Sequence, residues 1–185
     1  MTNILEKFSC KLKQSFPSCL KKDIETICEK NALKLSSLIH NTGTFNVMVN
    51  NEQLCIPDRI YLIEDNNFDS YTETQRNILY CFNTRHHDGF IREKYLKKII
   101  KLNNEWTIPY VIKLLGEYVI EILDAIYQDL ENIDIRLYKE FIEKNINFYE
   151  LTNQRIVSYW NCYYRWLYKN RKDYVGFKVL DCLNN

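Results

Sequence analysis

The segment Arg85-His86-His87-Asp88-Gly89 holds the residues best suited to chemistry in this chain. Two histidines and an aspartate can supply metal ligands or an acid–base pair. Because the side chains of adjacent residues diverge, one metal would need further ligands from elsewhere in the chain. The interpretation we favour is a polar loop between two helices, in which Asp88 caps the second helix. A binding role for the loop stays open as the alternative.

Glu117 and Glu121 lie one helical turn apart and would share a helix face. Such a pair can bridge metals in a helical bundle, but these sites also need histidines, and no Glu-x-x-His occurs here. The alternative is a solvated or ion-paired stripe. If the stripe is buried, we expect an arginine partner, because an unpaired buried carboxylate is costly. Cations are available at four positions: Lys113, Arg85, Arg92 and Arg155.

The run from Tyr159 to Lys172 mixes aromatic residues with cations. On a helix it would form two aromatic faces, and two faces exceed what one core face needs. We predict that the inward face holds Tyr159, Tyr163, Trp166 and Leu167. The surplus face, with Arg165 beside it, would then hold Trp160, Tyr164 and Tyr168. Aromatic residues and arginine are enriched at protein interfaces, but they also stack on bases and hold phosphates.

Helices must position most of these residues. Helical spacing of apolar residues predicts helices over residues 3–14, 19–39, 73–84, 90–102, 109–130, 134–145 and 151–170. Thr72 with Gln75 resembles a capping box. The helix over 109–130 is apolar around most of its circumference, which is typical of a central helix in a bundle.

One segment changes from helical to alternating periodicity. Phe45, Val47 and Val49 alternate with polar or flexible residues, and Asn50-Asn51 suits a tight turn because asparagine tolerates positive φ. The sequence therefore predicts a β-hairpin near residues 44–63, with the second strand continuing at 60–63. Pro57 confines that strand to an edge.

Composition narrows the class of protein. A chain of 185 residues with 46% hydrophobic and 26% charged residues is expected to fold, and four glycines and three prolines favour helices over a many-turned β-sandwich. The net charge of +1 gives no overall attraction to nucleic acid or membranes. The charges are nevertheless segregated, with basic blocks at 85–101 and 155–178 and acidic ones at 50–75 and 117–143.

Seven cysteines without C-x-x-C spacing predict reduced, packed thiols in a reducing cytosol. The first 16 residues lack the apolar core of a signal peptide, and charged residues interrupt the apolar stretch at 108–126. We therefore expect a cytoplasmic chain with no membrane partner, no bound metal and no cofactor.

Residues 73–130 resemble a HEAT-type helical repeat. In that family an aspartate opens the second helix and an arginine four residues later pairs back to it; Asp88 and Arg92 match these positions. Tyr95 departs from the pattern, since HEAT repeats carry a small residue there, and no second copy follows. The resemblance implies a helical interaction module.

These patterns predict a mainly α, single-domain bundle of about six helices with one inserted hairpin. Residues 1–40 would form N-terminal helices, 73–170 the helical core and 171–185 a packed tail. The predicted function is a non-enzymatic protein-interaction module, such as an adaptor, immunity or regulatory protein. Its binding surface would be the surplus aromatic face and the loop at 85–89. The alternatives are nucleic-acid binding by the two basic blocks, and a small enzyme using His86, His87, Glu117 and Glu121.

Overall fold

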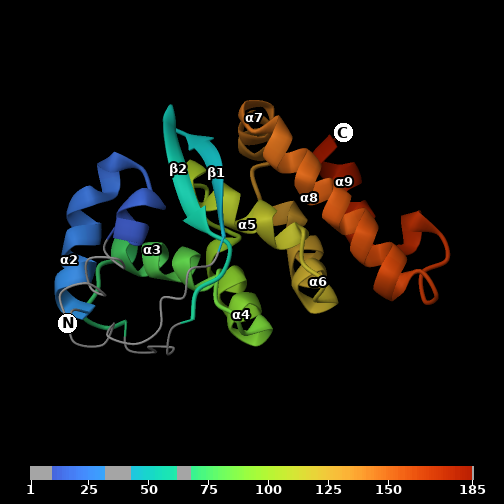
Figure 1. Cartoon of the computed structure of the whole chain (residues 1–185), viewed down its shortest axis with the longest axis horizontal. Coiled ribbons are helices and arrows are strands. Elements are labelled where there is room, and N and C mark those ends of the chain that lie inside the picture. The colour runs from blue at the N-terminus through green and yellow to red at the C-terminus, as the bar shows by residue number, and fades with distance from the viewer. Residues whose placement is uncertain (1–9, 32–42, 62–67, 185) are drawn as a thin grey trace.

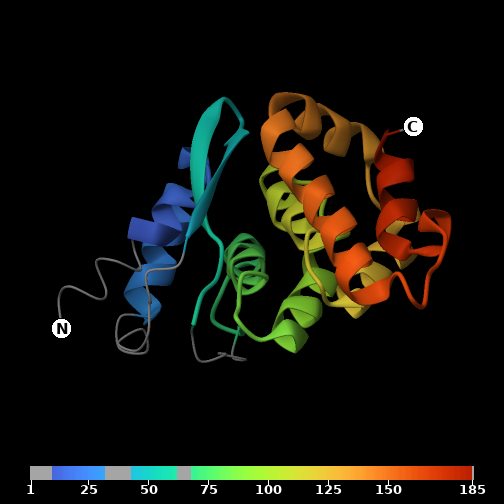
Figure 2. The ribbon, with the colours of Figure 1, turned by 45° about the vertical axis from the view of Figure 1, so that its right-hand side comes forward.

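The computed structural model describes residues 10–31, 43–61 and 68–184. It is mainly helical, and its described residues hold one antiparallel two-stranded sheet. The hairpin stands between α2 (Lys21–Asn31) on one side and α7 (Ile135–Lys144) and α8 (Ile146–Tyr159) on the other (Figures 1 and 2). The predicted fold class, a helical bundle with an inserted hairpin, is confirmed. The parts of the predicted N-terminal helices at 3–9 and 32–39 lie outside the described residues.

The hairpin has the predicted turn. Strand β1 (Thr44–Val49) pairs with β2 (Glu52–Pro57), with Val49 opposite Glu52. Asn50 and Asn51 have φ values of 51° and 62°, as a two-residue hairpin turn requires. The second strand ends at Pro57. Ile60, expected to continue it, forms instead a parallel bridge with His86, and 62–63 lie outside the described part.

Helices α3 (Glu73–Asn83) and α4 (Gly89–Ile99) flank the loop at 84–88, and both begin as predicted. Thr72 and Gln75 form the capping box. The carboxylate of Asp88 accepts a hydrogen bond from the Phe90 amide at 2.8 Å and caps α4. The polar-loop interpretation of this segment is therefore correct for Asp88.

The prediction of a single helix over 109–130 is wrong, because the helix ends at Leu115 and a new one begins at Ile120. Helix α5 (Ile108–Leu115) is buried along its whole length, and α6 (Ile120–Gln128) starts anew. A Cβ on Gly116 would lie 3.2 Å from Cδ of Arg155, so α8 passes close to the chain at this point. The break turns Glu117 away from the helical path and into the interior, where it is 3% exposed.

The predicted helix over 151–170 is also corrected. Helix α8 starts earlier, at Ile146, and passes into a π-helical turn (Trp160–Tyr164) before the chain reverses. Helix α9 (Val175–Asn184) then packs back with Val179 buried, so the tail is packed as expected. Short 3-10 turns connect other elements: Ser18–Leu20, Glu105–Thr107, Leu130–Asn132 and Arg171–Asp173.

Two further expectations concern solvent and membrane exposure. Of the seven free cysteines only Cys81 is buried, and Cys10, Cys19, Cys162 and Cys182 are exposed, so the expectation of packed thiols is wrong for most of them. Within the described ranges, every helix is too short or too polar to cross a bilayer.

Candidate functional site

An ion cluster built around Glu117 lies where the hairpin meets the helices. Arg59, just after β2, donates hydrogen bonds from Nη2 to both carboxylate oxygens of Glu117, at 2.6 and 2.7 Å. Arg92 of α4 donates to the same carboxylate at 3.3 Å, and Nη2 of Arg85 lies 3.9 Å away. The expectation that a buried Glu117 would recruit arginine is confirmed. We call Arg59, Arg85, Arg92 and Glu117 the ion cluster.

Arg85 is the most deeply buried cation of the cluster, at 0% exposure. It donates from Nε to the Pro57 carbonyl at 3.3 Å and from Nη2 to the Asp58 carbonyl at 2.7 Å. Burial lowers the pKa of the Arg85 guanidinium to about 9, although Glu117 acts in the opposite direction. Arg85 therefore remains charged at neutral pH and ties the loop after α3 to the end of β2.

A second ion pair lies beside the cluster. The Lys113 ammonium lies 2.6 Å from the carboxylate of Asp58 and 4.3 Å from the centre of the Phe45 ring. Burial lowers the pKa of Lys113 to about 8, against the opposing effect of Asp58. The pKa of Asp58 is lowered, because Lys113 and nearby arginines outweigh the upward effect of burial. Lys113, one of the four cations considered for Glu117, instead pairs with Asp58, which directly follows the hairpin.

The histidines are divided between interior and surface. His86 is 3% exposed, and its Nδ1 accepts a hydrogen bond from the Asp88 amide at 3.0 Å. His87 is exposed and its ring stacks on Tyr61, with ring centres 4.9 Å apart. Both backbone carbonyls accept hydrogen bonds from Nη1 of Arg92, at 3.0 and 2.8 Å. The loop thus joins the ion cluster through its backbone.

The remaining predicted polar residues do not assemble into one site. Glu121 lies on the exposed surface of α6, and the break after α5 separates it from the buried Glu117. The pairing of Glu117 and Glu121 on one helix face is therefore wrong. Arg155 packs its aliphatic stem against Gly116. Because arginines hold its carboxylate, Glu117 serves as their counter-ion. The cluster therefore connects the end of the hairpin to the helices.

The two aromatic faces at the end of α8 are reversed relative to prediction. Trp160 is 6% exposed and donates from Nε1 to the Tyr168 carbonyl at 2.9 Å. Tyr164 and Tyr168 are half-buried, and both rings pack on Tyr174. Trp160, Tyr164 and Tyr168 thus form the packed face, and the sequence did not indicate that Tyr174 would cover it.

The face predicted to point inward is the exposed one. Tyr163 is 57% exposed, Trp166 77% and Leu167 56%. Tyr118, from the break between α5 and α6, is 53% exposed and lies 6.4 Å from Tyr163 between ring centres. A half-buried Tyr159 contacts both rings. We call Tyr118, Tyr159, Tyr163 and Trp166 the aromatic ridge.

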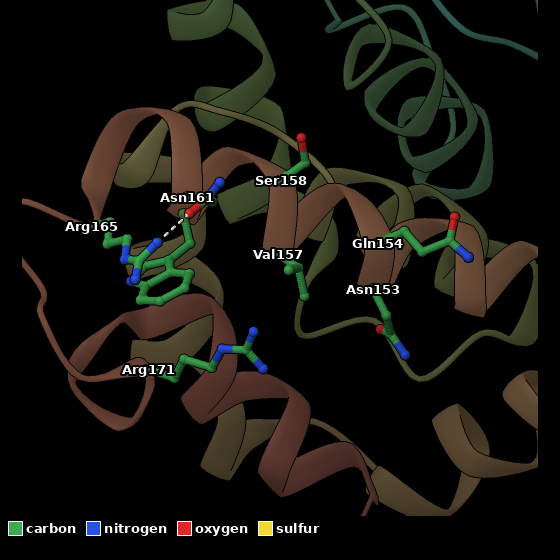
Figure 3. A pocket seen from close by; sticks show the side chains of 8 residues that line it. Asn153, Gln154, Val157, Ser158, Asn161, Arg165 and Arg171 are labelled. Carbon is green, nitrogen blue, oxygen red and sulfur yellow. Dashed lines mark hydrogen bonds between the residues drawn. The ribbon is translucent and has the colours of Figure 1, made fainter.

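A groove of about 730 Å³ runs along α8 beside this region (Figure 3). Arg165 and Arg171 lie at one end, and Arg165 donates to the Asn161 side chain at 3.0 Å. The other end carries amides of α8. We call it the amide groove, and its lining residues are Asn153, Gln154, Val157, Ser158, Trp160, Asn161, Arg165 and Arg171.

Among the residues with described positions, no group of three or more His, Cys, Asp or Glu side chains is arranged to hold a metal ion. Comparison of the chain with protein-family models, curated proteins and solved structures finds no match. The geometry of the ion cluster, the aromatic ridge and the amide groove therefore carries the functional argument.

Proposed function

We propose that this protein is a non-enzymatic protein-interaction module that binds its partner through the aromatic ridge. The observation that carries the proposal is the exposure of Tyr118 and Tyr163 side by side, with the exposed Trp166 indole bound to the Tyr163 carbonyl. Contiguous apolar surface of this kind marks interaction sites in soluble proteins. Tyrosine, tryptophan and arginine are also the residues that contribute most to protein-binding energy.

The ridge is well anchored from beneath. The Tyr164 hydroxyl donates to the Tyr118 carbonyl at 2.6 Å, and the Trp166 indole donates to the Tyr163 carbonyl at 2.9 Å. Trp160 lies under the turn and contacts Phe177 of α9, with ring centres 5.6 Å apart. Because a local hydrogen bond holds the Trp166 indole and another fixes the backbone at Tyr118, a partner that covers this surface orders less of the chain on binding.

Nucleic-acid binding is the second candidate, favoured by four exposed cations in residues 165–172: Arg165, Lys169, Arg171 and Lys172. The basic block at 85–101 gives this second candidate little support, because most of its cations are already buried or paired. Arg85 and Arg92 are buried in the ion cluster, and Lys97 and Lys101 pair with Glu93 and Asp129. The block at 85–101 therefore offers less free positive charge than its sequence indicates.

The experiment that tests the proposal is capture of partners by the tagged protein from the cells that make it, with and without nuclease. We expect one stoichiometric protein that survives nuclease and is lost from Trp166→Ala and Tyr163→Ala. The matched control is Phe90→Ala, which removes an 84% exposed aromatic side chain from α4 and should retain the partner.

Two outcomes would contradict the proposal. Partners lost on nuclease treatment would favour nucleic-acid binding. A protein retained equally by Trp166→Ala and Phe90→Ala would place the interface away from the aromatic ridge.

A further inference from the structure

The lining of the amide groove contains two arginines, Arg165 and Arg171. Both Arg165 and Arg171 are exposed, and the lining of the groove contains no aspartate or glutamate. In the portion of the chain that the structure describes, neither guanidinium forms an ion pair. This contrasts with the ion cluster, where each arginine is close to a carboxylate.

The two guanidiniums are held near one another by the same aromatic ring. The guanidinium carbon of Arg165 lies 5.6 Å from the centre of the Trp160 ring, and that of Arg171 lies 5.4 Å from it. Figure 3 shows the two side chains approaching the same end of the groove from different segments. Planar guanidiniums held in this way recognise carboxylates through paired hydrogen bonds.

The rest of the groove suits a peptide. The exposed carboxamide of Gln154 offers both a donor and an acceptor, which peptide groups can match. The aromatic ridge begins within two residues of Asn161 and supplies adjacent apolar surface. Base stacking is less well served here, because Trp160 is only 6% exposed.

We infer that the amide groove takes carboxylate side chains of an acidic peptide segment between Arg165 and Arg171, while apolar residues of that segment pack on the aromatic ridge. This inference rests on the proposed function and specifies the chemistry of the protein partner. Residues 165–173 carry four exposed cations and one acid, Asp173, and this excess of positive charge supplies the charge complementarity.

The test uses short fluorescein-labelled peptides in which glutamates alternate with leucines, a glutamine-for-glutamate version of each, and a single-stranded oligonucleotide. Fluorescence anisotropy measures their binding to the full chain. We expect Arg165→Gln/Arg171→Gln to weaken binding of the glutamate peptide about tenfold or more. Lys97→Gln/Lys101→Gln removes the same charge from a distant surface and should leave binding unchanged.

Several results would overturn the inference. Equal weakening by both double variants would mean that only net charge matters, and equal binding of the glutamine peptide would exclude carboxylate recognition. Tighter binding of the oligonucleotide would identify the groove as a nucleic-acid site.

The inference and the proposed function fail separately. A captured protein lost from Trp166→Ala but retained by Arg165→Gln/Arg171→Gln would overturn the inference alone. Arginine-dependent peptide binding in a protein that captures no partner would overturn the proposed function alone.

Discussion

Arg59 donates from one nitrogen to both carboxylate oxygens of Glu117, at 2.6 and 2.7 Å, and so joins the end of the hairpin to the break between α5 and α6. Arg92 brings α4 to the same carboxylate. One acidic side chain thus links three segments that lie far apart in the sequence. The stability of the whole arrangement should depend on it.

Replacement of Glu117 by glutamine should destabilise the protein severely. The change removes the negative charge that compensates buried Arg85 and Arg92, and loss of one partner from a buried ion pair costs about 3–5 kcal/mol. Urea denaturation would measure the free energy of unfolding. Glu121→Gln, on the exposed surface of α6, is the control and should change it by less than about 0.5 kcal/mol. Similar effects of the two variants would contradict the role of Glu117.

Lys113 should make stability rise with pH in the alkaline range. Burial lowers its pKa in the folded protein from 10.5 to about 8, so the unfolded chain binds more protons between these values. The free energy of unfolding, relative to Lys113→Met, should therefore increase on the order of 2 kcal/mol from about pH 8 to about pH 9.5. Urea denaturation of both proteins across this range would measure the difference. A flat difference would show that the ammonium keeps its ordinary pKa.

Truncation of the two tryptophans at the end of α8 should change the free energy of unfolding by very different amounts. Trp160→Ala removes a side chain that is 6% exposed and should destabilise the protein by about 3–5 kcal/mol. Trp166→Ala removes one that is 77% exposed and should change stability by less than about 0.5 kcal/mol. Thermal and urea denaturation would compare them. Equal losses would contradict the assignment of Trp160 to the packed face and Trp166 to the exposed one.

The hairpin should loosen when Asn145 is truncated. The Asn145 carboxamide accepts from the Met48 amide at 2.7 Å and donates to the Met48 carbonyl at 3.0 Å, so it satisfies both backbone groups of that strand residue. We expect Asn145→Ala to cost about 1–3 kcal/mol, because these groups lose their partners. Hydrogen exchange of the Met48 amide should accelerate. The exposed Asn147 is the control, and equal acceleration in Asn147→Ala would contradict this role.

Local features were readable from the chain because they depend on neighbouring residues. The capping box at Thr72, the cap at Asp88 and the turn at Asn50-Asn51 each involve contacts within a few positions. Apolar spacing likewise indicated most helices and the hairpin. The cost of burying an unpaired carboxylate predicted an arginine partner for a buried Glu117, but nothing in the sequence pointed to Arg59 as that partner.

Tertiary contacts determine which aromatic face is buried and where the helix after residue 108 ends. Periodicity marked two aromatic faces after residue 158 but could not choose between them. The choice depends on Phe177 of α9, which packs on Trp160, and on Tyr174 just before α9, which packs on Tyr164. The apolar run at 109–130 suited one helix, yet the helix ends where Gly116 packs against Arg155 of α8. Periodicity records how side chains are spaced along an element, whereas burial depends on which distant surface packs against it.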